Sequence, residues 1–298
     1  MRHGQNGNGA PCARIRCARR RRTRNPSKVG DPVAVEKTPR ACIFCDNPLT
    51  GIRAKEHAIP RWLMEYLGIT DDQLSSAVAQ SVDNAILIDR KMDAASFVEG
   101  RVCENCNHGW MSDLEKASID LLKPLIDGER NILTLSNDER TTLAKWTTKT
   151  AYVISHAAPL QKTPDASHLR YMKDNAGAVP LRVEVFGQQS INTGDFRQIQ
   201  RNQWPHLGEP LPNPAPPRGT YKIGFQFRCL LLLVAYWSDP KSIPMISASI
   251  QIPLWPINKL HITYHNQLPP LDMKNPMAPL DRFCSTLGVC DMDVFLTP

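Results

Sequence analysis

The sequence predicts an α+β protein in which a small zinc-stapled module precedes a β-rich C-terminal domain. The first observation is a pair of cysteine knuckles, Cys42-Ile43-Phe44-Cys45 and Cys103-Glu104-Asn105-Cys106, with 57 residues between them. The second is a change of pattern at Pro180, after which short segments alternate apolar and polar residues, as is typical of β-strands. The third is a long helical pattern between the two parts, which begins at Ser136.

Composition places the chain among ordinary globular proteins. Its 298 residues are 42% hydrophobic and 22% charged, which excludes fibrous and disorder-dominated classes. The longest apolar run, Leu230 to Trp237, is too short to cross a bilayer, and Met1 to Ala10 lacks the apolar region of a signal peptide. We therefore expect a cytoplasmic protein with no membrane partner, and its nine cysteines favour metal binding over disulfides.

The net charge of +7 is concentrated in residues 1–40. This segment contains eleven Lys or Arg and two acidic residues, so it carries a net charge of +9, and the remaining 258 residues carry −2. A basic segment without apolar periodicity predicts a disordered arm, which can add affinity for a nucleic acid of any sequence. The alternative is that these residues are upstream sequence included by a mistaken start site.

The first folded region is expected over residues 41–128. A hairpin is predicted at the first knuckle, followed by a short helix from Pro60 to Gly68 with proline at its start. Residues 70–79 are predicted as a second, weaker helix. Ile86-Leu87-Ile88 and Phe97-Val98 are predicted as the cores of two strands.

Helices are expected at the end of this region and in the segment that follows. One is predicted to start between Gly109 and Ser112, because apolar residues recur there at helical spacing. Ser136 and Glu139 have the spacing of a capping box, and helical spacing then continues to about Ala157. Residues 129–178 are therefore predicted as a helical connector, whose long helix packs on the zinc module or bridges to the next domain.

The remaining residues, 179–298, are predicted as a β-rich domain. Its expected strands lie in Leu181–Phe186, Tyr221–Phe227, Leu230–Tyr236, Ser247–Pro253 and Leu260–Tyr264. The stretch 205–217 contains six of the chain's 25 prolines, which predicts an irregular surface loop. This domain is a candidate for target specificity, for partner binding, or for contacts between copies of the chain in a homo-oligomer.

The two knuckles predict one zinc site. Zn²⁺ prefers tetrahedral sulfur ligation, and a two-residue gap lets both thiolates of one turn reach the same ion. The predicted ligands are Cys42, Cys45, Cys103 and Cys106. The metal would act as a clasp, bringing Glu56 and His57 near Asn107, which directly follows the last cysteine.

These three residues offer groups for the hydrolysis of a phosphodiester, which needs a base for water and a cation beside the scissile phosphate. His57 can take a proton from water near pH 7, because the ordinary pKa of imidazole is about 6.5. Glu56 and Asn107 carry oxygen atoms of the kind that Mg²⁺ takes as ligands. Asn107 can equally cap the helix beside it, and a surface role is expected for its neighbour His108.

In this order the residues resemble the HNH endonuclease family, which has the ββα-metal fold. In that family an Asp-His pair ends the first strand of a hairpin, and a C-x2-C-H or C-x2-C-N knuckle opens the helix, as Glu56-His57 and Cys103 to Asn107 do here. The resemblance covers residues 41–128 and implies a DNA endonuclease with His57 as general base. It also implies that Glu56 and Asn107 hold a catalytic Mg²⁺ or Mn²⁺, while the four cysteines hold a structural zinc.

Three features depart from the family pattern. Glu56 replaces the commoner Asp, and its extra methylene moves the carboxylate by roughly one bond length. The 57 residues between the knuckles are more than compact members have, so they must hold an insertion. The family's central Asn has a single, poor candidate here, Asn84.

Two alternatives stay open. The cysteines can instead hold a catalytically silent zinc ribbon that binds nucleic acid or protein, with Glu56-His57 coincidental. An independent enzyme in the C-terminal domain is disfavoured, because its sequence has no nucleophile elbow, phosphate loop or second metal cluster. The basic residues near the site can contact DNA phosphates or form a solvated face; they are Arg53, Lys55, Arg61 and Arg101.

Overall fold

The computed structural model describes residues 40–49, 54–71, 73–79, 86–158, 164–191, 196–201, 219–247, 249–264, 270–271, 274–275 and 277–291. The predicted basic arm up to residue 39, the proline-rich stretch at 205–217 and Asn84 lie outside these ranges. The chain from Pro39 to Pro298 groups as one compact unit, and the boundaries predicted inside it at residues 41, 129 and 179 stay predictions.

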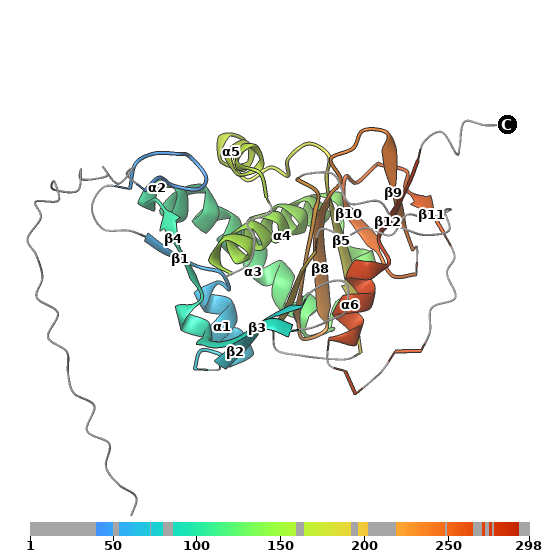
Figure 1. The fold of residues 1–298 in the computed structure, drawn as a ribbon, viewed down its shortest axis with the longest axis horizontal. Helices are drawn as coiled ribbons and strands as arrows, with labels where there is room; N and C mark the ends of the chain where they lie inside the picture. Colours follow the sequence, from blue (N-terminus) through green and yellow to red (C-terminus); the bar gives the residue numbers. More distant parts are fainter. Residues whose placement is uncertain are drawn as a thin grey trace, which may run out of the picture. The chain divides into compact units, whose positions relative to one another are not determined.

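The fold is mixed α+β with a β-rich C-terminal half, as the sequence predicts (Figure 1). The N-terminal elements are β1 (Ala54–His57), α1 (Arg61–Leu67), β2 (Gln73–Ala79), β3 (Ile86–Asp93), η1 (Ala94–Ser96), β4 (Val98–Val102), α2 (Glu104–Cys106), η2 (Asn107–Met111) and α3 (Ser112–Ile126). The connecting elements are η3 (Ile132–Thr134), α4 (Asn137–Ala157) and α5 (Ala166–Asp174). The C-terminal elements are β5 (Val183–Gln189), β6 (Arg197–Arg201), β7 (Tyr221–Phe227), β8 (Leu230–Tyr236), β9 (Ser242–Ile246), β10 (Ile252–Trp255), β11 (Ile262–Thr263), α6 (Ala278–Ser285) and β12 (Gly288–Asp291).

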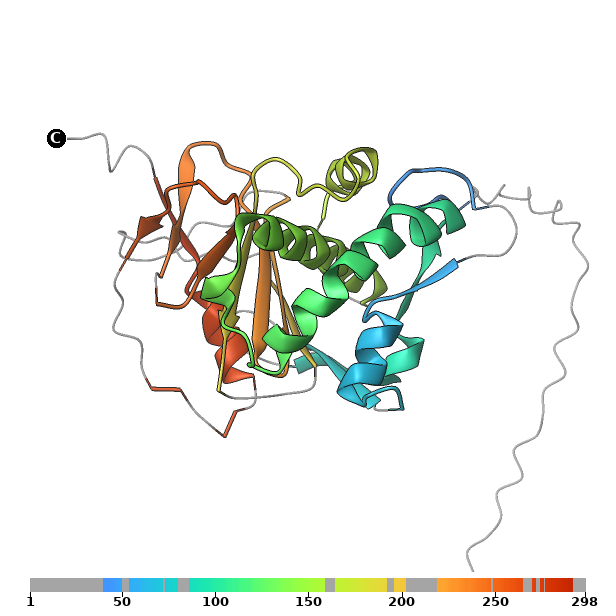
Figure 2. The same cartoon turned by 180° about the vertical axis from the view of Figure 1, so that it is seen from behind.

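The largest sheet has five antiparallel strands in the order β10-β5-β8-β7-β6. Helix α4 packs on one face and α6 on the other (Figure 1 and Figure 2). In β8, Leu232 and Val234 join the core shared with α4, whereas Leu231 and Leu233 join the core under α6. Because both faces of this strand are buried, its sequence is continuously apolar instead of alternating.

Three smaller sheets complete the described strands. β1 and β4 form an antiparallel pair, β2 and β3 form another, and β11-β9-β12 form a three-stranded sheet. The β1–β4 pair leads directly through Cys103 into α2, η2 and α3. The second cysteine knuckle therefore lies at the junction between the β1–β4 pair and the helical elements α2, η2 and α3.

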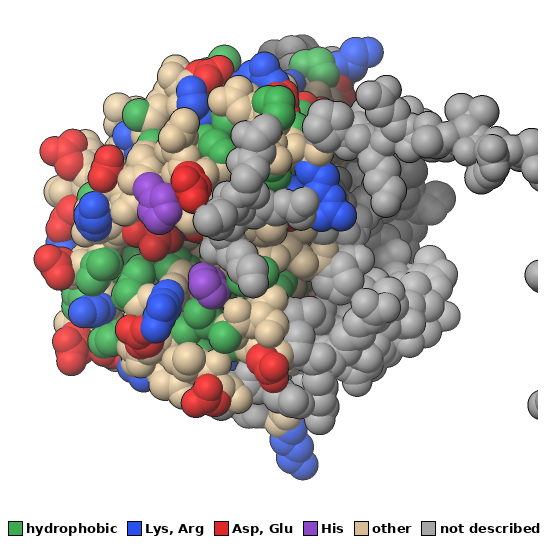
Figure 3. Space-filling view, turned by 90° about the vertical axis from the view of Figure 1, so that its left-hand side faces the viewer, with side chains coloured by type: hydrophobic (Ala, Val, Ile, Leu, Met, Phe, Trp, Pro, Cys, Tyr) green, Lys and Arg blue, Asp and Glu red, His purple; other side chains and the backbone are tan. Residues whose placement is uncertain are grey.

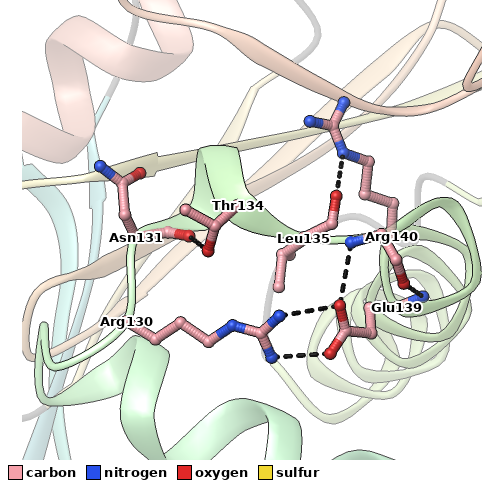
Figure 4. A network of polar contacts seen from close by, with 7 residues as sticks. Arg130, Asn131, Thr134, Leu135, Glu139 and Arg140 are labelled. Carbon is pink, nitrogen blue, oxygen red and sulfur yellow. Dashed lines mark hydrogen bonds and ion pairs between the residues drawn. The ribbon is translucent and has the colours of Figure 1, made fainter.

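Helix α4 connects these regions. Its predicted capping box is confirmed, because the Ser136 hydroxyl accepts from the backbone N–H of Glu139 and the Glu139 carboxylate accepts from the backbone N–H of Ser136. Arg130 donates two further hydrogen bonds to that carboxylate, at 2.6 and 2.8 Å (Figure 4). Further along, Trp146 is fully buried beside the rings of Phe225 and Phe227 of β7, and α4 also packs on β4. The long helix therefore packs on the N-terminal elements from β1 to α3 that surround the cysteine knuckles, called the zinc region below. It also packs on the five-stranded sheet and so bridges the two.

Several local predictions are confirmed. The hairpin at the first knuckle is a tight turn closed by a single antiparallel bridge between Ala41 and Pro48. Helix α1 begins after Pro60 and ends at Gly68, whose φ of 75° suits glycine. Strands are present where the sequence predicts them around Ile86, in β4, and in β5, β7, β8 and β11. The strand predicted at Ser247–Pro253 is wrong for most of its length, because residues 249–250 form a turn and only Ile252 and Pro253 belong to a strand, β10.

One prediction in the N-terminal region is wrong. Residues 73–79 form strand β2 instead of a helix, since they pair along their length with β3 and contain Ser75, Ser76 and Val78, which are weak helix formers. The helix expected to start between Gly109 and Ser112 is present, because α3 begins at Ser112. It is preceded by the short helix α2 within the second knuckle and by η2, in which Gly109 has non-helical dihedral angles.

Some described elements were not predicted, namely α5, β6, β9, α6 and β12. Strand β6 has the sequence Arg-Gln-Ile-Gln-Arg, and an edge strand with so few apolar residues gives no readable alternation. Among the described residues, no helix has the length and apolar character needed to span a bilayer.

Candidate metal centre and catalytic site

The four predicted zinc ligands come together in space. The Sγ atoms of the two knuckles all lie within 4.8 Å of one another, and those of Cys45 and Cys103 are 3.6 Å apart. Four sulfurs at about 2.3 Å from one ion in a tetrahedron would lie roughly 3.8 Å apart. The cluster therefore fits zinc in both donor type and spacing, and the four cysteines could hold a zinc ion.

Hydrogen bonds organise the cluster before any metal is considered. The backbone N–H of Ile43 donates to the backbone carbonyl of Arg101 at 2.8 Å, which ties the first knuckle to β4, the strand that leads into the second. The backbone N–H of Cys103 donates to Sγ of Cys42 at 3.4 Å. A hydrogen bond from the Cys106 thiol lowers the pKa of the Cys42 thiol to about 4, and the same contact raises the pKa of Cys106. Binding of a metal would displace the remaining thiol protons.

Glu56 lies in the β1–β4 pair, directly opposite Glu99. Both side chains are buried, at 8% and 4% exposed, and residues opposite each other on two strands share one face of the pair. Each is matched by its own cation: Arg101 donates to Glu99 at 3.1 Å, and Lys149 of α4 donates to Oε1 of Glu56 at 3.2 Å. Without these cations the two carboxylates would repel each other.

Lys149 also contacts a second carboxylate, Glu115 of α3. The lysine is 1% exposed, so three elements, β1, α3 and α4, meet at one buried ammonium. Burial by itself disfavours the charged lysine, but Glu115 and Glu56 outweigh it and raise the pKa of Lys149. Burial raises the pKa of Glu56, and the positive charge of Lys149 opposes that shift.

The η2 segment directly follows the second knuckle and packs against α3, the helix that carries Glu115. His108 is exposed, as expected, and is the weakest of the groups that act on the raised pKa of the buried Glu56. Asn107, its neighbour, is half-buried and lies inside the helical run, so it does not occupy the N-cap position of α3, which is held by Met111. The alternative role of Asn107 as the cap of that helix is therefore wrong.

His57 is the last residue of β1, is half-buried, and pairs with Val98. Its neighbour Ala58 donates a backbone hydrogen bond to Phe97 at 2.8 Å, which fixes the chain as it leaves the strand. The predicted convergence of His57 and Asn107 on one divalent cation stays a prediction.

The predicted basic contacts near the site are only partly described. Arg61 is exposed beside Glu65 of α1, and Arg101 is shared between Glu99 and His156, whereas Arg53 and the Lys55 side chain lie outside what the structure describes. Figure 3 shows that acidic, basic and histidine side chains mix on the face over β1, β4, α1 and α2. A role of these residues in phosphate binding stays a prediction.

Sequence reasoning missed Lys149 and Glu115. Glu115 belongs to the acidic first turn of α3, where a carboxylate is expected for the helix dipole alone, so the sequence contained no signal of its contact with Lys149. Lys149 was detectable only as a charged residue within a stretch of α4 that is otherwise buried.

Comparison of the chain with protein-family models, with curated proteins and with solved structures found no match.

Proposed function

We propose that this protein is an HNH-type endonuclease that hydrolyses phosphodiester bonds in DNA. In this proposal, residues 41–128 form the nuclease module, the cysteine cluster holds a structural zinc, and His57, Glu56 and Asn107 carry the chemistry. The observation that carries the proposal is the β1–β4 pair, which holds Glu56 and leads through a four-cysteine cluster into η2 and α3. In the proposal, this arrangement lets the end of β1 and the segment carrying Asn107 meet at one cation.

Each residue has a distinct role. His57 takes the proton from the attacking water, and its half-buried position leaves it within reach of solvent. The Glu56 carboxylate and the Asn107 amide oxygen would hold a divalent cation, Mg²⁺ or Mn²⁺, which when bound supplies charge stabilisation beside the scissile phosphate. Lys149 contacts Oε1 of Glu56, so a carboxylate with two oxygens can serve both partners.

A second candidate function is a zinc-stapled module that binds nucleic acid or protein without cutting it. The ion pair between Glu56 and Lys149 favours this reading, because it already neutralises the carboxylate that the nuclease needs. In that case Glu56 serves only to anchor α4 on the zinc region.

A plasmid-nicking assay separates the two candidates. Zinc-loaded wild type, His57→Ala and His206→Ala are incubated with supercoiled DNA and Mg²⁺ or Mn²⁺, and zinc content is measured for each. His206 belongs to no motif and serves as the matched control. Loss of the general base is expected to slow cutting by about 100-fold or more without loss of zinc.

The contrary result is equally definite. If zinc-loaded wild type cuts no duplex, branched or single-stranded DNA with either cation, the nuclease proposal fails and the binding module replaces it. If His57→Ala cuts as fast as wild type, His57 is not the base.

A further inference from the structure

The buried ammonium of Lys149 joins β1, α3 and α4 at the candidate site. Its Nζ lies 3.2 Å from Oε1 of Glu56 and also contacts Glu115. These two partners are 93 and 34 residues away in sequence, so only the tertiary fold brings them together.

Placing Lys149, Glu56 and Glu115 (the Lys149 triad) together in or near the core costs free energy. An ammonium and two carboxylates all lose hydration, and a buried ion pair often stabilises a protein no better than apolar side chains of the same volume. A lysine at this position does what an apolar residue cannot: it fixes the direction of a long, flexible glutamate side chain. Glu56 is also the residue whose direction matters most to the proposed function.

The position of Lys149 is itself set by the C-terminal sheet. One turn before it, Trp146 packs beside the rings of Phe225 and Phe227, and one turn after it, the Tyr152 hydroxyl shares a 2.6 Å hydrogen bond with Tyr221 of β7. Both anchors are fully buried, so α4 cannot rotate or slide without breaking them. The sheet therefore determines where the ammonium meets Glu56.

We propose that Lys149 is a positioning residue, which holds Glu56 in the direction needed to bind the catalytic cation and thereby makes the site dependent on the C-terminal half. This inference rests on the proposed function, since it concerns the same site. It assigns Lys149 no contact with substrate.

The sign of one effect distinguishes positioning from simple electrostatics. Lys149→Met removes a positive charge beside Glu56, and on Coulomb's law alone a cation should then bind more tightly. If instead the lysine positions the carboxylate, its loss should weaken binding, because removing a residue that orients a metal ligand usually costs about 10- to 100-fold in affinity.

The experiment is a Mn²⁺ titration of the zinc-loaded full chain in the absence of DNA. Electron paramagnetic resonance monitors the titration and reports the bound fraction of Mn²⁺. We expect Lys149→Met to bind Mn²⁺ at least about 10-fold more weakly than wild type. Its matched control is Lys145→Met, which removes the same charge from the preceding turn of α4 at a half-buried position and should leave the affinity unchanged or slightly tighter. In nicking assays, kcat of Lys149→Met should fall by about 100-fold with little change in KM.

A second variant guards against a failure to fold, because Lys149→Met leaves the buried Glu56 and the half-buried Glu115 without their shared cation. In a Glu115→Gln background one of those charges is gone, and adding Lys149→Met there should again weaken Mn²⁺ binding relative to the background alone. If neither lysine variant folds and keeps zinc, Lys149 is a structural residue and the proposal is overturned.

The remaining outcomes are separable. A folded Lys149→Met that binds Mn²⁺ as tightly as wild type, or more tightly, overturns the positioning role while the nuclease proposal stands. A wild type that neither binds Mn²⁺ outside the cysteine cluster nor cuts DNA overturns the nuclease proposal, and the positioning role falls with it.

Discussion

The zinc region and the C-terminal sheet of this protein reach a folded state by different means. β1 and β4 form only a two-stranded pair, which on its own would be marginal in water, and the cysteine cluster and α4 hold it in place. The sheet of five strands has apolar cores on both faces, and none of its described strands carries a cysteine of the cluster. A zinc ion at the cysteines would replace part of the core in the first region, whereas apolar packing on two faces supports the second.

Buried charge also differs between the two regions. In the sheet, Lys222 donates to the backbone carbonyls of Cys284 and Leu287 at the end of α6, where a cation favourably meets the helix dipole. In the zinc region, Lys149 instead contacts two carboxylates, one of which lies beside His57. A buried lysine therefore does not by itself indicate a functional site. Its partners differ: Lys222 binds carbonyls at the end of a helix, whereas Lys149 contacts carboxylates, one of which is a proposed metal ligand.

The largest expected effect is loss of the metal. Cys106→Ser should abolish stoichiometric zinc binding and unfold the β1–β4 region, because structural zinc contributes about 10 to 16 kcal/mol in zinc-finger peptides near pH 7. Zinc content and amide hydrogen exchange measure this, with exchange expected to rise first in β4 and α2 while β7 and β8 stay protected. Cys229→Ser, outside the cluster, is the control and should keep its zinc. Full retention of zinc by Cys106→Ser would remove the basis of the comparison.

The next effect tests the contact through which the sheet supports the zinc region. Trp146→Ala should cost about 3 to 5 kcal/mol in the free energy of unfolding, because it empties a fully buried site beside Phe225 and Phe227. Urea denaturation measures the loss. Leu133→Ala, at a residue 59% exposed, should change stability by less than about 0.5 kcal/mol. Equal effects of the two substitutions would show that Trp146 does not anchor α4 on the sheet.

A smaller effect separates backbone strain from crowding. Gly177 and Gly68 both have left-handed backbone conformations, with φ of +80° and +75°. Alanine at either should cost about 1 to 2 kcal/mol for that conformation. At Gly177 the added Cβ would also lie 3.3 Å from Leu114 and Trp110, whereas at Gly68 nothing lies within 4 Å. The midpoint temperature of thermal unfolding should therefore be lower for Gly177→Ala than for Gly68→Ala. The opposite order would contradict the close packing at Gly177.

The smallest effect concerns pH. The hydrogen bonds from Arg130 lower the pKa of Glu139 from its ordinary 4.5 to about 2, so the unfolded chain binds the proton more readily (Figure 4). Stability from this pair is therefore complete above about pH 4.5 and is lost as pH falls towards 2. Glu139→Gln should flatten the acid side of the stability profile, while Glu129→Gln, at an exposed residue nearby, should follow wild type. An unchanged slope in Glu139→Gln would show that the pair contributes nothing.

Sequence patterns predicted the parts of this fold that depend on local information. The capping box at Ser136 and the apolar run of β8 are contained in a few adjacent residues, and each cysteine knuckle needs only a two-residue gap. The helix predicted at residues 70–79 was wrong because residues 73–79 pair with β3, and this pairing overrides a weak helical pattern. The Lys149 triad was missed because its partners are brought together only by the packing of α4.

The central claim is that one divalent cation binds Glu56 and Asn107 beside His57, apart from the zinc. Anomalous diffraction from crystals of the zinc-loaded protein grown with Mn²⁺ tests it most directly. The account predicts zinc at the four cysteines and a separate manganese peak about 2.1 Å from oxygens of Glu56 and Asn107. Zinc at the cysteines with no manganese at Glu56, and with the Asn107 side chain directed elsewhere, would contradict it.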